Sequence, residues 1–413
     1  MKICIITHHQ VINNPRLYRE ADALAGAGHA VRVIAVRQTP EDSILDQNLA
    51  EQSRWRLQTI NIEKKGSGYA DWLRTGLRYK AAKRIWSLGG GGKRLAGYAY
   101  TRTFSETIGR VLSEPTDLII AHTQPMLAPA YFAAQRLGIP WGFDCEDILS
   151  EEYGEGTGDP SHQRLVRYVE KTFMREAAYV TAASPLYLPW LEQHCGVKNP
   201  VLVRNLPSLA DMPEAPVPGF PEKRKHLSLH WFSQSVGPER GIEDILRATA
   251  QARFPLELHL RGTLLASYRQ KFERLINMLA LERRVFVHAR VAPGQVIRKA
   301  SEHDMGLALM QACSVNHEMA VPNKLYFYMA AGLAVAATRT PGQQAALSGL
   351  PAMGFMYTPG DPEDLRRQLT RVYEHPELLG QWRSQAFQLA RTQLNWEREK
   401  ETLIRTVEKV AAT

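Results

Sequence analysis

Lys324 lies in the first turn of a predicted helix that begins near Pro322 and stops at Gly332. Proline favours the first turn of a helix, and glycine favours the position just past the last turn. The helix dipole disfavours a cation at this end, so a lysine there makes sense if a bound anion compensates for its charge. The lysine and the free N–H groups of the turn would then bind the same anion, and the pattern indicates a diphosphate site.

A second cationic loop follows the strand predicted at 227–232. Arg240 and Gly241 stand where this loop opens the next helix, and an arginine can bind a phosphate through two N–H groups. Cations and helix N-termini can stabilise a diphosphate without a metal ion. We therefore predict a diphosphate site with Arg240 and Lys324, and we expect no metal and no further cofactor. The plainer alternatives are an ordinary loop–helix–strand unit and a surface arginine.

Both segments resemble the donor-binding parts of family 4 (group 1) retaining glycosyltransferases, in particular those that assemble bacterial surface polysaccharides. The resemblance rests on the runs Pro-Asn-Lys-Leu and Tyr-Met-Ala-Ala-Gly within 322–332 and on the loop ending at Arg240. It implies a retaining transfer of a sugar from a nucleoside-diphosphate sugar to a glycan acceptor, which we expect to be lipid-linked. The catalytic candidates it implies are His122, Arg240, Glu318 and Lys324, and the donor-binding candidates are Ser235, Gly241, Asn323, Leu325 and Tyr326.

Two positions depart from the pattern of that family. Ser235 stands where the first of two phosphate-binding cations is expected, and a hydroxyl can hydrogen-bond a phosphate but cannot neutralise it. Phe327 replaces the glutamate that binds the ribose hydroxyls, and Met319 replaces the one near the sugar, with Glu318 beside it. We expect Glu318 to serve as the carboxylate. The alternatives are a catalytically impaired relative acting as a binding or scaffold protein, and a sugar-nucleotide epimerase of similar architecture.

Polar side chains also follow the strands predicted in the first half. His122 comes directly after a buried strand, and the resemblance implies a histidine there, at the edge of a cleft, that reaches the donor sugar; the alternative is a structural histidine. Asp144 opens a cluster of acids after the next strand, which could hydrogen-bond acceptor hydroxyls, cap a helix or act as a base. A divalent cation is a weaker alternative for this cluster. The acceptor-binding candidates are Arg16, Asp144, Glu146 and Asp147.

The stretch from Lys64 to Arg102 is strongly basic, with Asp71 as its one acid and with tryptophan and leucine interleaved. This composition is typical of a helix that lies on an anionic membrane surface. The alternative is a solvated helix pair with a core-facing stripe. The net charge of +9 also admits nucleic acid, which we do not expect because no known binding module is visible. The residues expected to contact the membrane are Trp72, Arg74, Arg78, Lys83, Arg84 and Trp86.

The chain has 413 residues, 44% hydrophobic and 23% charged, which suits a globular protein of two domains. Strands alternate with helices in both halves, so we predict an α/β fold of two Rossmann-like domains whose parallel sheets face across a cleft, the glycosyltransferase-B architecture. The four cysteines are scattered, and neither a signal peptide nor an apolar run of ~18 residues is visible, which favours the cytoplasm. The expected boundaries are 1–205 for the first domain, 206–222 for a proline-rich linker, 223–390 for the second domain, and 391–413 for a helix that packs back toward the first.

Overall fold

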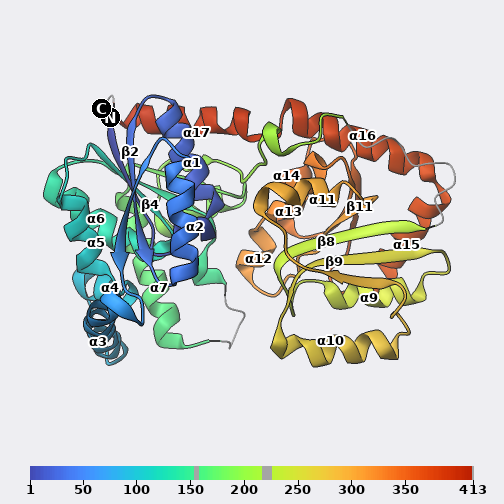
Figure 1. The fold of residues 1–413 in the computed structure, drawn as a ribbon, viewed down its shortest axis with the longest axis horizontal. Coiled ribbons are helices and arrows are strands. Elements are labelled where there is room, and N and C mark those ends of the chain that lie inside the picture. Colours follow the sequence, from blue (N-terminus) through green and yellow to red (C-terminus); the bar gives the residue numbers. More distant parts are fainter. Residues whose placement is uncertain (153–157, 216–225, 412–413) are drawn as a thin grey trace. The chain divides into compact units, whose positions relative to one another are not determined.

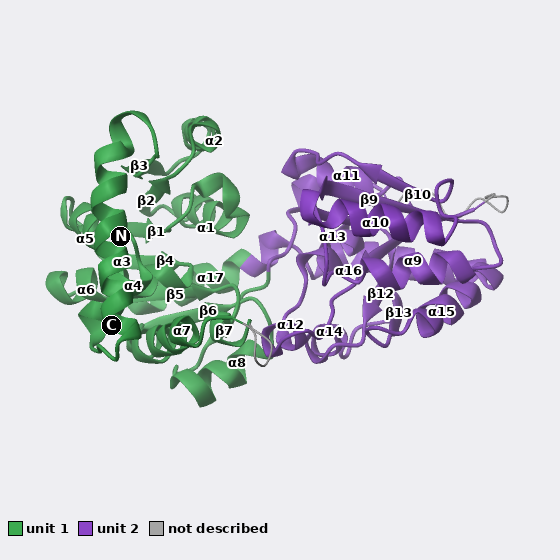
Figure 2. Ribbon diagram, turned by 90° about the horizontal axis from the view of Figure 1, so that it is seen from below, with its two compact units in different colours: residues 1–204, 400–413 green, residues 205–399 purple. Residues whose placement is uncertain are grey.

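The computed structural model describes residues 1–152, 158–215 and 226–411. The chain forms two compact units (Figure 2). Unit 1 consists of Met1–Arg204 together with Lys400–Thr413, and unit 2 consists of Asn205–Glu399. Each unit has its own parallel sheet and its own core, and each is described separately below.

Unit 1 is built on a parallel sheet of seven strands, in the order β3-β2-β1-β4-β5-β6-β7. The central strands are buried, apart from Lys2, because helices cover both faces of the sheet (Figure 1), and their sequences are accordingly apolar runs. The strands are β1 (Lys2–Ile6), β2 (Ala30–Arg37), β3 (Arg56–Asn61), β4 (Leu118–His122), β5 (Trp141–Cys145), β6 (Tyr179–Ala182) and β7 (Val201–Leu202). The helices are α1 (Pro15–Gly26), α2 (Pro40–Glu51), α3 (Tyr69–Ser87), α4 (Lys93–Tyr100), α5 (Phe104–Leu112), α6 (Leu127–Leu137), α7 (Pro160–Phe173) and α8 (Tyr187–Trp190).

Unit 2 repeats this plan with six parallel strands, in the order β10-β9-β8-β11-β12-β13. Two apolar clusters form its core; one contains Trp231 and the other contains Tyr328. The strands are β8 (Leu227–Val236), β9 (Leu256–Leu264), β10 (Val285–His288), β11 (Met305–Ala308), β12 (Ala334–Thr338) and β13 (Gly354–Tyr357). The helices are α9 (Ile242–Gln251), α10 (Ala266–Met278), α11 (Val296–Ala300), α12 (Val315–Met319), α13 (Asn323–Ala330), α14 (Pro341–Leu347), α15 (Pro362–Glu374), α16 (Pro376–Thr392) and α17 (Trp396–Ala411), the last of which continues into unit 1.

The order of the strands reverses once in each sheet, between β1 and β4 in unit 1 and between β8 and β11 in unit 2. In doubly wound sheets, ligands bind beyond the carboxyl ends of the strands at such a switch point. These topologies confirm two Rossmann-like α/β domains with parallel sheets. Ligand-binding residues are therefore expected at the carboxyl ends of β1, β4, β8 and β11.

The structure corrects two of the expected boundaries. The part of the proposed linker 206–222 that is described, up to residue 215, belongs to unit 2: Leu206 is buried in its core, and Ser208 accepts the N–H of Ala210 to cap a short turn. The rest of that linker lies outside the described residues. The final helix does not begin at residue 391, because α16 continues to Thr392 and α17 begins at Trp396.

Several residues expected at a membrane are turned inward by the packing of α3. Trp86 was predicted wrongly, since only 4% of it is exposed and its ring packs against that of Tyr168. Trp72 is half-buried beneath Arg102, and Arg78 donates to Glu106 at 2.6 Å. Of the remaining expected residues, Arg74 pairs with Asp71 and Glu106, Lys83 is half-buried, and Arg84 is exposed.

Candidate active site

Lys324 occupies the first turn of α13, beyond the carboxyl end of β11. Its Nζ lies 5.2 Å from the centre of the Trp231 ring and 6.0 Å from that of Phe232, so the ammonium group rests on aromatic faces. Desolvation, together with the positive charge of Arg240, lowers the pKa of Lys324 to about 8. Within the described chain Lys324 has no ion pair. A desolvated cation at a helix start, without an anion to compensate for it, has the properties of an anion-binding group.

Arg240 stands beside this lysine, in the turn between β8 and α9. It is exposed, and its only hydrogen bond among the residues in the structure is a long one of 3.4 Å to the hydroxyl of Ser233. Gly241 follows with φ +70°, and a Cβ there would lie 2.6 Å from the Cβ of Leu309. The glycine therefore allows the turn to approach the end of β11 closely, which keeps Arg240 near Lys324.

Of the remaining residues predicted to bind the donor, some lie where they can contact a ligand and others do not. Asn323 is exposed at the start of α13, where it can contact a ligand. Leu325 and Tyr326 are buried in the core, so the prediction is wrong for their side chains. Ser235 lies within strand β8, paired with Thr263, rather than in a loop, because β8 continues to Val236 past an irregularity that begins at Phe232.

Two further side chains near α13 bear on the missing glutamates of the family. Glu318 lies on α12 and is exposed, with no partner for its carboxylate in the described part of the chain. Phe327 packs on the ring of Phe232, with 5.9 Å between the ring centres. The space expected for a ribose-binding carboxylate is therefore partly occupied by an aromatic contact, and Glu318 is the acid available for a polar ligand.

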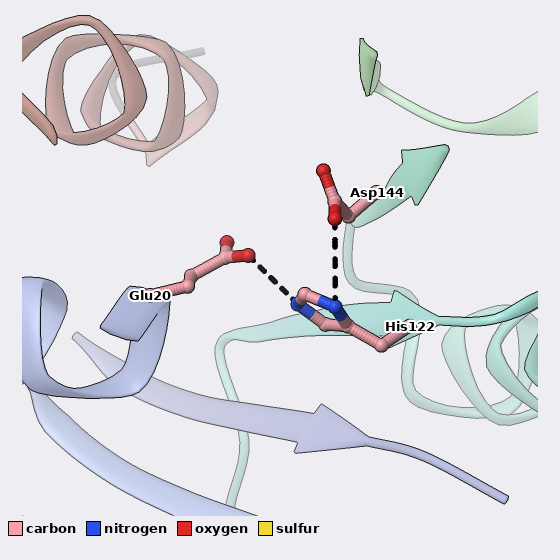
Figure 3. Close-up of side chains that lie close together, drawn as sticks. All are labelled: Glu20, His122 and Asp144. Atoms are coloured by element: carbon pink, nitrogen blue, oxygen red, sulfur yellow. Dashed lines mark hydrogen bonds and ion pairs between the residues drawn. The ribbon is translucent and has the colours of Figure 1, made fainter. Parts of the chain in front are cut away.

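Unit 1 places a buried network of charges at its own switch point (Figure 3). His122, the last residue of β4, is fully buried, and its Nε2 lies 2.7 Å from the carboxylate of Glu20 on α1. Its Nδ1 lies 3.5 Å from the carboxylate of Asp144 on β5 and 3.8 Å from that of Glu146. The prediction of His122 at a cleft edge is therefore wrong. With no exposed surface and both nitrogens facing carboxylates, it positions its neighbours rather than contacting a sugar.

The protonation of His122 follows from these neighbours. Burial alone would lower the pKa of His122, but the hydrogen bond to Glu20 and the nearby carboxylates of Glu20, Glu146 and Asp144 raise it to about 10. Burial likewise disfavours the charged form of Asp144, yet the charge and hydrogen bonds of Arg16 hold the pKa of Asp144 below its usual value. At neutral pH the network thus contains an imidazolium and a guanidinium facing carboxylates.

Arg16 and Asp144 bind each other rather than an acceptor. The guanidinium of Arg16 donates from Nε and Nη2 to the two oxygens of Asp144, at 2.5 and 2.7 Å, and both residues are buried. Their predicted role in direct acceptor contact is therefore wrong. Glu146 accepts a hydrogen bond from Asn14 and remains partly exposed, and Asp147 is exposed, so these two can face a ligand.

In the described chain, the ligand atoms of Glu20, His122 and Asp144 lie close enough together to hold a metal ion. The other groups present do not suit one. Arg16 already occupies both oxygens of Asp144, and the raised pKa of His122 keeps its nitrogens protonated, whereas a metal requires them free. Two internal cations thus compensate the carboxylates, and we interpret the cluster as a positioning network.

Sequence reasoning missed three residues of this region. Glu20 stands four positions after Arg16, a spacing that puts both on one face of α1 and could have identified it. His8 lies two residues past the end of β1, and its Nδ1 lies 2.8 Å from the hydroxyl of Thr123. Thr123 has φ +70°, a strained value for a threonine, of the kind found at functional sites.

These two units, with paired cations at the switch point of one sheet and a charged network at that of the other, define the class of glycosyltransferases with the glycosyltransferase-B fold. Two sequence families agree. The family "Glycosyl transferase 4-like domain" matches residues 14–205, and the family "Glycosyl transferases group 1" matches residues 229–375. The chain belongs to the group 1 glycosyltransferases. No curated protein sequence matches it.

Solved structures show the same fold along the whole chain. Sucrose-phosphate synthase from Thermosynechococcus elongatus superposes with a TM-score of 0.75 at 14% identity, covering 100% of this chain and 99% of that one. HepE from Anabaena, in complex with UDP, gives a TM-score of 0.69 at 16% identity, with 99% and 100% covered. The lipopolysaccharide outer core galactosyltransferase WaaB gives 0.63 at 14% identity, with 99% of each chain covered. In the part of this chain that is described, no helix has the length and apolar sequence needed to cross a bilayer.

Proposed function

We propose that this protein transfers a sugar from a nucleoside-diphosphate sugar to a glycan acceptor, with retention of the sugar's configuration and without a metal ion. The observation that carries the proposal is the pair Lys324 and Arg240, two cations close enough that the charge of one lowers the pKa of the other. Like charges that face each other at a helix start favour a ligand with two negative groups, and a diphosphate supplies them.

The reaction assigns these residues distinct tasks. The bond between the anomeric carbon of the sugar and the diphosphate breaks, a bond from that carbon to an acceptor hydroxyl forms, and the proton of the hydroxyl passes to the departing diphosphate. Negative charge develops on the leaving diphosphate, where Lys324 and Arg240 stabilise it. Glu318, the exposed acid of α12, hydrogen-bonds the hydroxyls of the donor, since Phe327 offers no polar atom at the other expected position.

For the acceptor we propose a lipid-linked glycan, extended in the cytoplasm during surface polysaccharide synthesis. Support comes from the resemblance of the donor segments to that branch of the family and from the similar fold of WaaB, a lipopolysaccharide galactosyltransferase. In unit 1 two acids just past the end of β5, the partly exposed Glu146 and the exposed Asp147, provide acceptors for the hydrogen bonds of sugar hydroxyls. Asn14, which caps α1, donates a hydrogen bond to Glu146 and so holds it in place.

Calorimetric titration with UDP, GDP and ADP tests the donor site first. HepE is known in complex with UDP, so UDP is the ligand expected to bind. Release of UDP from UDP-sugars, with and without added glycan, then tests catalysis. A second candidate, a scaffold protein without transfer activity, is favoured by the packing of Phe327 on Phe232. Absence of binding to all three nucleotides at millimolar concentration would reject the enzyme and support the scaffold.

A further inference from the structure

Helix α3 of unit 1 exposes a row of large apolar side chains. Tyr69, Leu73 and Leu77 are spaced by four residues, which puts them on one face, Ile85 lies farther round the same exposed side, and Leu88 follows just past the helix end. Their exposed fractions are 48%, 40%, 69%, 52% and 71%. Of the thirteen large apolar side chains exposed in the described chain, five thus lie in this one segment. Apolar residues gathered in this way mark an interaction surface, whereas single ones do not.

The orientation of α3 is fixed by its opposite face. Thr75, Ala82 and Trp86 are buried, and Arg78 and Arg74 both bind Glu106 of α5. The helix lies at the outer edge of unit 1, on the far side of α4 from the sheet (Figure 1). Rotation of α3 to hide the apolar row would expose Trp86 and break the ion pairs. The row is therefore a permanent part of the surface.

Positive charge accompanies the apolar row. Lys80 and Arg84 follow Leu73 and Leu77 by seven residues each, so they lie on the same face. Both are exposed, and neither has an ion pair among the described residues.

We propose that this face of α3 docks on the surface of an anionic lipid bilayer, with the apolar row inserted among the acyl chains and Lys80 and Arg84 against the lipid phosphates. A helix that lies in the membrane interface needs both kinds of side chain on one face. Nucleic acid would use the cations but not the apolar row, and a second copy of α3 would bring like charges together. Docking on the membrane would bring the enzyme to a lipid-linked acceptor. Only this purpose rests on the proposed function; the docking itself does not.

Co-sedimentation with vesicles tests the proposal without donor or acceptor. The protein should bind vesicles of phosphatidylcholine mixed with phosphatidylglycerol, bind phosphatidylcholine alone far more weakly, and lose affinity steeply between about 0.05 and 0.5 M salt. The double variant Leu73→Gln/Leu77→Gln should bind at least about tenfold more weakly, because two apolar side chains no longer leave water. The double variant Lys80→Gln/Arg84→Gln should lose about fivefold for each cation.

A matched control removes an apolar residue and a cation from another exposed helix surface. Met278 and Arg274 of α10 are both exposed, and Met278→Gln/Arg274→Gln should bind vesicles like the wild type. Equal binding to neutral and anionic vesicles, no binding to either, or equal losses in the control would overturn the proposal. So would a concentration-dependent oligomer that only the Leu73→Gln/Leu77→Gln variant abolishes, since a second copy would then cover the row. UDP titration of the same variants distinguishes a failure of the membrane proposal from a failure of the donor site, because α3 does not contribute to the donor site.

Discussion

Replacement of Lys324 by alanine tests the diphosphate site most directly. The ammonium group is half-buried on Trp231 and Phe232 and has no ion pair in the described structure, so its charge is available to a ligand. A hydrogen bond to a charged group contributes roughly 1.5–3 kcal/mol. Lys324→Ala should therefore weaken UDP binding by about tenfold to about 150-fold, measured by titration calorimetry.

Binding of UDP at this site should weaken as the pH rises. The pKa of Lys324 is about 8 in the free protein, and a bound diphosphate keeps the amine charged. For such a group, the protonated fraction falls from roughly nine-tenths at pH 7 to roughly one-tenth at pH 9. The dissociation constant for UDP should accordingly rise about tenfold between pH 7 and pH 9.

Two companion variants make this result specific. Lys324→Arg keeps a charge at all pH values of interest, so its affinity for UDP should change little over the same range. Lys271→Ala removes an exposed lysine from α10, and it should behave as the wild type. An affinity that does not depend on pH in the wild type, together with unchanged binding by Lys324→Ala, would refute the assignment of the diphosphate to this helix.

Three further changes follow from the site. Glu318→Gln should reduce turnover or donor affinity while leaving the melting temperature unchanged, because the carboxylate is exposed and without a partner in the described chain; a fully active variant contradicts its role. Gly241→Ala should weaken UDP binding and lower stability by roughly 1–3 kcal/mol in urea unfolding, since φ is +70° and the new Cβ meets Leu309. Glu20→Gln should cost roughly 3–5 kcal/mol of unfolding free energy near neutral pH. Because the pKa of His122 is about 10 in the folded protein against an ordinary value of 6.5, this loss should be complete below pH 6.5 and shrink as the pH rises toward 10; a loss that does not change with pH is evidence against the network.

Much of the fold was predictable because parallel strands that are buried on both faces appear in the sequence as short apolar runs. The runs at β1 and β4 are almost wholly apolar, and the alternation of such runs with helices indicates the doubly wound topology. The exceptions have physical causes. Strand β8 extends through the polar residues up to Val236 because β9 pairs with it. This pairing is a tertiary contact, which cannot be predicted from the local sequence.

The sequence predicted which types of residue form the candidate site, but it did not predict how deeply they are buried. A polar residue after a strand indicates the carboxyl edge of a sheet, and His122 does lie there, but its complete burial depends on α1 and on Glu20, which approach from elsewhere in the chain. The pairing of Arg16 with Asp144 is likewise a long-range contact. Lys324 was easier to identify, because a cation in the first turn of a helix contradicts a local rule and so indicates a ligand.

The division of α17 between the units has a consequence for biosynthesis. Unit 2 is continuous in sequence, whereas unit 1 is completed only by the segment from Lys400 onward, in which Leu403 and Val407 are buried and Glu408 pairs with His29. The ribosome therefore makes all of unit 2 before it makes the part of α17 that covers the apolar surface of unit 1. Until then the first two hundred residues keep that surface open, a period in which a nascent chain is most exposed to aggregation and to chaperones.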